Sequence, residues 1–265
     1  MNRIIVFALM LFCMTMQIEA QTLSEEEVTA KMYQAFELNK AGKKAEALEL
    51  FLIVGENTKQ QRNEGERQVY VCSQTMACQC YELLGRYQEG YLLGKSLLQG
   101  KLNDEERKDV GHLYAMNGYM YACEFIQRDE KGRADYKRGR ELISEILPYS
   151  DGQVKEFAET KIPLSWYFEG AQYAMTQSYD EALSSYEKAL NGFRDLGRVS
   201  EEVDVLSGIA SVKAHLCKFD EAKRVYYQAF VLANQNGKVN KQMDVLRELW
   251  SLGNTTGDMK LIRST

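Results

Sequence analysis

Two consecutive stripes of alternating large and small side chains constrain the fold of this 265-residue chain, and they lie between Trp166 and Leu190. The first stripe places Trp166, Gly170 and Tyr173 at i, i+4 and i+7, the spacing of one face of an α-helix. After a short break, a second helical stripe contains Tyr179, Ala182, Leu183, Tyr186, Ala189 and Leu190. Because Gly170 and Ala182 leave room for close backbone approach, the stretch predicts two helices packed against each other.

This stretch resembles the tetratricopeptide repeat (TPR), a family in which helical hairpins stack into a solenoid. The residues that match the TPR pattern are Trp166, Gly170, Tyr173, Ala182 and Tyr186. Glu169 stands where the pattern has a leucine, and the proline that ends the pattern is absent. The resemblance implies an all-α fold, a TPR-type helical-hairpin solenoid wound into a right-handed superhelix.

Ala182, the small residue early in the second helix, serves as a reference position, or anchor, and equivalent positions recur along the chain. These positions are Ala47, Gly90, Gly139, Ala182, Ala222 and Ile262, which are 40 to 49 residues apart. This interval exceeds the usual TPR period of about 34 residues, so each helix pair is longer. The chain is therefore expected to hold about five and a half repeats, at about residues 24–62, 66–101, 104–149, 151–197, 200–237 and 240–265. The last repeat stops soon after its anchor, so either this end frays or the chain belongs to a longer protein.

Helix start and stop signals agree with these boundaries. Ser24 has the spacing of a capping box, and Ser200 precedes two glutamates as the predicted N-cap of another helix. Gly197 is predicted to end a helix. Residues 153–161 are predicted to form an additional helical segment that leads to a kink at Pro163.

The first 20 residues have the composition of a secretory signal peptide. A basic start at Arg3 precedes an apolar run over residues 4–14 and a cleavage site after Ala20. The run is too short to span a bilayer comfortably as a helix, although a retained N-terminal anchor is the alternative. The sequence therefore predicts export to the periplasm or the cell envelope.

The net charge of −5 argues against nucleic acid or an anionic membrane as a partner, because both favour clustered Lys and Arg. Contact with a membrane is expected only indirectly, through an anchor or a segment outside this chain. Residues 128–140 include Lys137, Arg138 and Arg140, but acidic residues interleave with them. They are predicted to form a solvated loop and helix face, with a nucleic-acid or phospholipid patch as the alternative.

Five cysteines remain after residue 20, namely Cys72, Cys78, Cys80, Cys123 and Cys217. Export permits disulfides, but an odd number without regular spacing does not form a disulfide framework. They are predicted to be free thiols that act as small hydrophobic residues, with one disulfide pair left as the alternative.

No catalytic motif or metal-ligand spacing is present in the sequence. The two histidines, His112 and His215, have no Cys, Asp or Glu at ligand spacing and are predicted to be structural. The sequence therefore predicts a protein that is not an enzyme and that needs no cofactor or metal.

Binding is the function class that remains, with a protein or a peptide as the expected partner. In a TPR solenoid the first helices line a concave groove, so their residues outside the packing stripe are candidates. The predicted groove residues are Met32, Phe36, Tyr119, Tyr167, Ala171, Met175, Ser211 and His215. The alternative for each is burial against a neighbouring repeat.

A signal peptide followed by long-period TPRs resembles the periplasmic input region of sensor histidine kinases and related regulators common in Bacteroidetes. This resemblance of layout implies a sensory, non-catalytic module of a signal-transduction protein. The alternative is a free periplasmic scaffold or adaptor that assembles envelope proteins. The oligomeric state is left open by the sequence.

Overall fold

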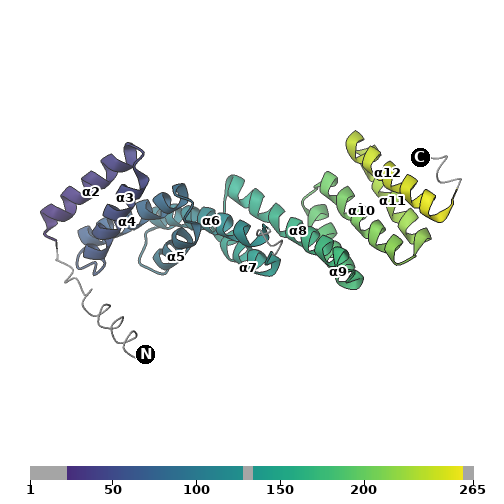
Figure 1. The fold of residues 1–265 in the computed structure, drawn as a ribbon. Coiled ribbons are helices and arrows are strands. Elements are labelled where there is room, and N and C mark those ends of the chain that lie inside the picture. Colours follow the sequence, from purple (N-terminus) through teal and green to yellow (C-terminus); the bar gives the residue numbers. More distant parts are fainter. Residues whose placement is uncertain (1–22, 128–133, 259–265) are drawn as a thin grey trace, which may run out of the picture. The chain divides into compact units, whose positions relative to one another are not determined.

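The computed structural model describes residues 23–127 and 134–258, and every regular element in these ranges is a helix (Figure 1). The predicted signal peptide lies outside these residues, as do Ile262 and most of the long connection after α6. The chain divides into two compact units, Met1–Asn117 and Gly118–Thr265.

The N-terminal unit consists of antiparallel helices joined by short turns. They are α2 (Glu25–Lys40), α3 (Lys44–Thr58), α4 (Glu64–Leu83), α5 (Tyr87–Leu98) and the first part of α6 (Asp104–Ile126). Each of the helices α2 to α4 contacts the next one along the chain. The core contains Ala35, Ala47, Leu48, Phe51, Ala77, Cys80 and Tyr81.

The C-terminal unit continues the same construction. Its helices are the end of α6, α7 (Tyr136–Ile146), the 3-10 turn η1 (Leu147–Tyr149), α8 (Gly152–Met175), α9 (Tyr179–Asp195), α10 (Val199–His215), α11 (Phe219–Gln235) and α12 (Val239–Thr256). The predicted all-α architecture of stacked helical hairpins is confirmed in both units. The predicted hand of the superhelix concerns the whole array and stays a prediction.

The same turn joins most consecutive helices. A residue with a φ of 57° to 80° follows the helix by two positions, and the next helix starts two positions later. This left-handed residue is Gly42, Gly85, Gln177, Gly197, Cys217 or Gly237. The stop predicted at Gly197 is confirmed, and glycine suits the position because it has no Cβ.

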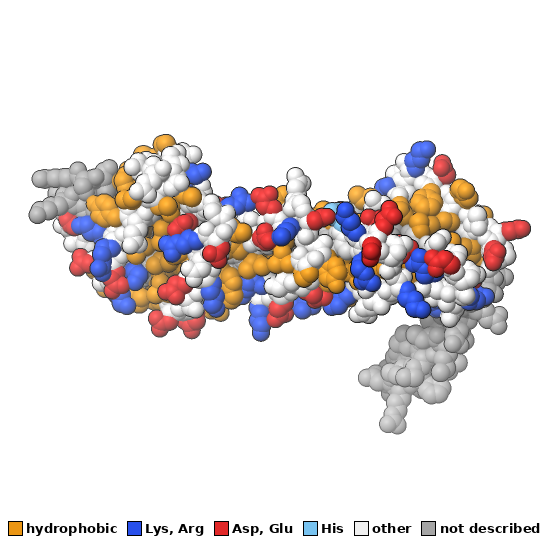
Figure 2. Space-filling model, turned by 180° about the vertical axis from the view of Figure 1, so that it is seen from behind, with side chains coloured by type: hydrophobic (Ala, Val, Ile, Leu, Met, Phe, Trp, Pro, Cys, Tyr) orange, Lys and Arg blue, Asp and Glu red, His pale blue; other side chains and the backbone are white. Residues whose placement is uncertain are grey.

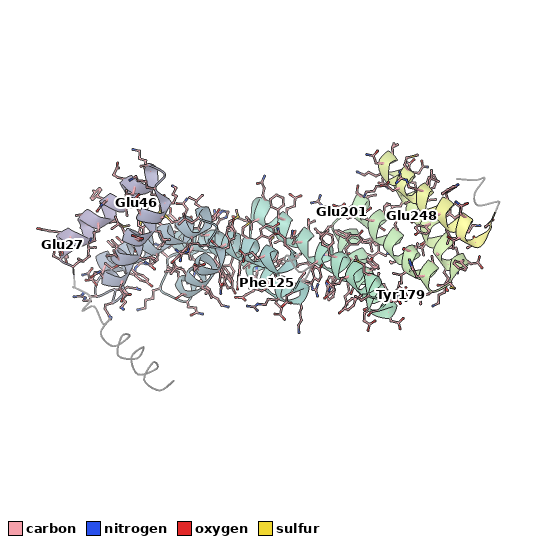
Figure 3. The ribbon with its side chains drawn as sticks, viewed as in Figure 1. Glu27, Glu46, Phe125, Tyr179, Glu201 and Glu248 are labelled. Atoms are coloured by element: carbon pink, nitrogen blue, oxygen red, sulfur yellow. The ribbon has the colours of Figure 1, made fainter. Side chains whose placement is uncertain are left out.

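The Ser24 capping box is confirmed, because Ser24 Oγ accepts from the Glu27 amide and the Glu27 carboxylate accepts from the Ser24 amide. Figure 3 labels Glu27 in the first turn of α2. The N-cap predicted at Ser200 is wrong. Helix α10 begins at Val199, and its N-cap Arg198 makes no side-chain capping bond. The tight turn at Gly197 starts the helix before Ser200, which therefore lies in its first turn.

The helix predicted at residues 153–161 is confirmed as the first part of α8, which runs unbroken from Gly152 to Met175 with Pro163 inside it. The Pro163 ring lies against Gly192 of α9, where an added Cβ would come within 2.8 Å of the ring. Close contact between the two helices thus accommodates a residue that usually disrupts a helix interior.

Tyr186 of α9 forms the centre of the C-terminal core. A Cβ added to Gly170 of α8 would lie 2.8 Å from its ring, and a Cβ added to Gly208 of α10 would lie 2.9 Å from it. Both glycines therefore let a first helix approach the tyrosine. Tyr186 thus fills the space beside both glycines.

Candidate functional site

The C-terminal unit contains a hollow of about 1220 Å³ between α7 and α9, with α8 as its floor. We call it the α7–α9 hollow. The floor consists of Ile162, Trp166, Glu169 and Tyr173, which share one face of α8 at i, i+4, i+7 and i+11. Helix α8 contacts both walls.

Two cationic side chains lie against the ring of Trp166. The Arg140 guanidinium carbon is 3.4 Å from the centre of the indole, and the Lys188 ammonium is 4.2 Å from it. Each contact is favourable because the face of an aromatic ring attracts cations, by about 0.5–2 kcal/mol. Trp166 thus joins the α7 wall to the α9 wall.

Arg140 is held in place by further bonds. Its guanidinium donates to Glu169 Oε2 at 2.9 Å and to Ser165 Oγ at 3.2 Å, and only 9% of the residue is exposed. Burial lowers the pKa of Arg140, whereas the neighbouring Glu169 carboxylate acts in the opposite direction. Arg140 is therefore fixed by partners inside the protein.

The α9 wall has charges of opposite sign at its two ends. Glu181, Ser184, Ser185 and Lys188 line the hollow along one face of the helix. Glu181 and Lys188 are seven residues apart, or roughly 10 Å along a helix. Among the described residues neither side chain forms an ion pair, although the Lys188 ammonium lies against the Trp166 ring.

These positions confirm one interpretation of the sequence and correct another. Trp166 and Tyr173 pack against the core, as predicted, but they are only half-buried and also line the hollow. Arg140 does not belong to a solvated helix face, because α8 covers it. The sequence signal for the hollow beside Trp166 and for the burial of Arg140 was Glu169, which replaces the leucine of the TPR pattern with a carboxylate beside the tryptophan.

The predicted groove residues are distributed over both units, with Met32 and Phe36 in the N-terminal one. Met32 packs against the core, and Phe36 meets Phe51 edge to face at 5.4 Å while 36% of it stays exposed. Neither residue borders the α7–α9 hollow.

Most of the predicted groove residues of α6 and α8 pack against other side chains inside the C-terminal unit. Tyr119 stacks on Phe157 at 6.3 Å, and Tyr167 lies 5.8 Å from the ring of Tyr186. Ala171 packs against the core, whereas Met175 is 74% exposed. Burial raises the pKa of the Tyr167 hydroxyl, as does the negative charge of Asp204.

Ser211 and His215 line a second, smaller hollow of about 230 Å³ between α10, α11 and α12. Tyr226 of α11 and Glu248 of α12 also border it, and Figure 3 labels Glu248. His215 Nδ1 is 2.8 Å from the Ser211 carbonyl oxygen, and its ring lies 6.0 Å from Tyr179. Burial raises the pKa of Tyr226. The structure thus places these two predicted residues together.

Cys72, Cys78, Cys80, Cys123 and Cys217 are all free thiols, as predicted. Cys78 is buried, which raises the pKa of its thiol to about 12. The described residues contain no group of three or more His, Cys, Asp or Glu side chains placed to hold a metal ion. Within the same ranges, no helix has both the length and the apolar character to cross a membrane. Charged side chains of both signs are interspersed on the face that Figure 2 shows.

No family model matches this chain, and no curated protein matches it. Solved structures with a similar fold include apo RapI, which is 16% identical over 90% of this chain and 81% of RapI, with a TM-score of 0.38. The TPR protein TTC0263 of Thermus thermophilus is 16% identical over 82% of this chain and 96% of its own, with a TM-score of 0.32.

The TPR2AB domain of yeast Sti1, solved as a complex with pHSP90, is also similar. It is 12% identical over 91% of this chain and 96% of its own, with a TM-score of 0.36. At these identities and scores the likeness concerns helical repeats in general and carries no argument about a ligand.

Proposed function

We propose that this chain is a non-catalytic, exported interaction module that binds a segment of a protein or a free peptide in the α7–α9 hollow. The observation that carries the proposal is the lining of the hollow. A half-buried tryptophan lies at its floor between two cations, and Glu181 and Lys188, which form no ion pair among the described residues, lie about 10 Å apart on one wall. Peptides supply both charges and an apolar side chain over such a distance.

An extended peptide advances about 3.3 Å per residue, and its alternate side chains share one face. A basic and an acidic side chain two or four residues apart therefore lie on the same face, about 7 or 13 Å apart, and their flexible ends reach Glu181 and Lys188 together. The apolar side chain between them lies against Tyr173 on the floor of the hollow, and aromatic residues of this kind dominate binding energy at protein interfaces. Serines on both walls add hydrogen-bonding groups.

Crosslinking in the native host tests this site. A photoreactive phenylalanine at Ser184, inside the hollow, is expected to capture a peptide or protein, and Trp166→Ala is expected to reduce the yield at least about tenfold. The matched control carries the same residue at Asn191, which is exposed on α9 but does not line the hollow. Equal adducts at both positions, or none at Ser184, would refute the binding site.

We further propose a periplasmic sensory role, as the input region of a signal-transduction protein. A predicted signal peptide before an all-helical module that we propose to bind peptides supports this role, because such a module provides affinity without chemistry. The alternative is a free periplasmic scaffold, and deletion of the gene separates the two. A transcriptional response lost on deletion and restored by wild-type protein, but not by Trp166→Ala, is expected for a sensor.

Export can be tested independently of peptide binding. The mature protein from the host is expected in the periplasmic or envelope fraction with Gln21 at its N-terminus, because cleavage follows Ala20. N-terminal sequencing and fractionation decide the point. A cytoplasmic protein that retains Met1 would contradict export and leave the peptide-binding proposal to be tested by itself.

A further inference from the structure

The smaller hollow between α10, α11 and α12 differs from the α7–α9 hollow in its charge and in its hydrogen-bonding groups. We call it the α10–α12 hollow, and the two hollows share no lining residue. No Lys or Arg lines it, so its one carboxylate makes it acidic while its histidine is neutral. The polar side chains that line it are those of Ser211, His215, Tyr226, Glu248, Ser251 and Thr255.

The hydroxyl of Tyr226 shows how these groups are used. It forms hydrogen bonds with the Glu248 carboxylate and with the Ser211 hydroxyl. A carboxylate only accepts, so Tyr226 donates its single proton to Glu248 and accepts the proton of Ser211. Burial and the negative charge of Glu248 both raise the pKa of Tyr226, so the hydroxyl keeps this proton at neutral pH.

His215 and Thr255 have also used their donors. The His215 Nδ1 lies 2.8 Å from the Ser211 carbonyl oxygen, which can only accept, so Nδ1 carries the proton and Nε2 of the neutral ring is an acceptor. The Thr255 hydroxyl donates to the Ser251 carbonyl oxygen at 3.0 Å, and its oxygen can still accept. Apart from the Ser251 hydroxyl, which can take either role, the polar side chains of the hollow thus offer acceptors.

The charge of Glu248 is not neutralised by an ion pair with any described residue. Arg247, the neighbouring cation on α12, is paired instead with Asp244 at 3.0 Å. The Glu248 carboxylate accepts from Tyr226 and has capacity for further bonds, because its two oxygens offer about four acceptor positions. Glu248 and His215 are both exposed, so a ligand can reach them from solvent. A cation that donates several hydrogen bonds therefore complements this hollow.

We propose that the α10–α12 hollow binds an alkylguanidinium group, which either an arginine side chain of a partner or a free alkylguanidine supplies. A guanidinium has planar donors that match a carboxylate, and it is more weakly hydrated than an ammonium, so it tolerates apolar walls. Ala214, Phe219 and Leu252 provide those walls, and the face of the Phe219 ring attracts cations.

The size of the hollow agrees with this ligand. Its volume of about 230 Å³ corresponds to roughly seven water-sized groups of about 30 Å³ each, similar to the number of non-hydrogen atoms in an arginine side chain. A ligand of this size is expected to bind at micromolar to millimolar concentration. The site is independent of the peptide-binding hollow proposed above.

Isotope-labelled histidine gives a direct measurement, because the chain has only two histidines. His215 lines the hollow, whereas His112 lies on α6 and serves as an internal control in the same NMR spectrum of the mature chain. Butylguanidine is expected to shift the His215 signal until it saturates and to leave the His112 signal unchanged. Butylurea, which lacks the charge, and butylamine, which lacks the planar donors, are each expected to bind at least about tenfold more weakly.

A charge-neutralising pair of variants tests the role of Glu248. Glu248→Gln is expected to raise the dissociation constant for butylguanidine at least about tenfold, because it removes the charge and keeps the shape. The matched control is Asp244→Asn, which neutralises an exposed carboxylate of the same helix outside the hollow and should leave the constant unchanged. Circular dichroism confirms that each variant folds.

Two further probes separate the sources of the guanidinium. N-acetylarginine N-methylamide presents it as a residue of a protein does, and agmatine presents it on a free alkyl chain. Binding of the first probe as tightly as butylguanidine identifies an arginine of a partner as the ligand, whereas binding of agmatine alone identifies a free alkylguanidine.

Three results would overturn the proposal. Butylguanidine could leave the His215 signal unchanged at millimolar concentration. Butylurea or butylamine could bind as tightly as butylguanidine. Glu248→Gln could bind butylguanidine as the wild type does.

Discussion

Replacing Tyr186 by alanine is expected to lower the free energy of unfolding of the C-terminal unit by about 3–5 kcal/mol, the range for removing a buried aromatic side chain. Tyr186 is only 4% exposed, and its ring fills the space between Gly170 of α8 and Gly208 of α10. Neither glycine has a side chain that can move into the cavity, so the loss should lie in the upper part of this range. Urea unfolding followed by circular dichroism measures the change.

Tyr186→Phe is the matched control, because it keeps the ring and removes only the hydroxyl. It should cost clearly less than Tyr186→Ala if packing between the glycines is the source of the stability. A loss below about 1 kcal/mol for Tyr186→Ala would show that α8 and α10 close the cavity, which contradicts the central position of this ring.

The second large effect is expected in the N-terminal unit. Phe51→Ala should lower the free energy of unfolding by about 3–5 kcal/mol, because Phe51 is fully buried among Ala35, Ala47 and Leu48. Two of these three neighbours are alanines, so little neighbouring side chain is available to fill the space. The midpoint and the slope of the urea unfolding curve give the change in the free energy of unfolding.

Phe36→Ala provides the comparison within the same aromatic pair. Phe36 contacts Phe51 edge to face at 5.4 Å but keeps 36% of its surface in water. Its removal should therefore cost about 1–2 kcal/mol, because less apolar surface returns to solvent. Similar losses for the two variants would mean that the ring contact, rather than burial, governs the stability at this position.

The helices themselves were predictable because their signals are local. Residues within one turn of each other decide whether a helix forms, and the Ser24 capping box and the Gly197 stop act over three or four residues. The turns at Gln177 and Cys217 carry no glycine, yet they adopt the same left-handed conformation as Gly197. Their geometry follows from the hairpin, which needs this turn to pack its two helices.

The candidate site was less accessible to sequence reasoning. Trp166, Gly170 and Tyr173 were identified as one helical stripe, but Arg140 and Lys188 come from α7 and α9 on either side of α8. Nothing within a few residues of Arg140 indicates that its guanidinium will lie 3.4 Å above an indole. Such contacts join residues more than about 20 positions apart, so helix packing decides them.

The sequence by itself determined that this protein is all helical, that its helices pair, and that small residues such as Gly170 lie where helices meet. These properties depend on the 3.6-residue period and on side-chain size, which the sequence states directly. The tertiary structure alone decided that Trp166 borders a hollow, that Arg140 is buried against it, and that Trp250 is left exposed. Burial depends on which helix lies opposite, and that is a property of the packed array.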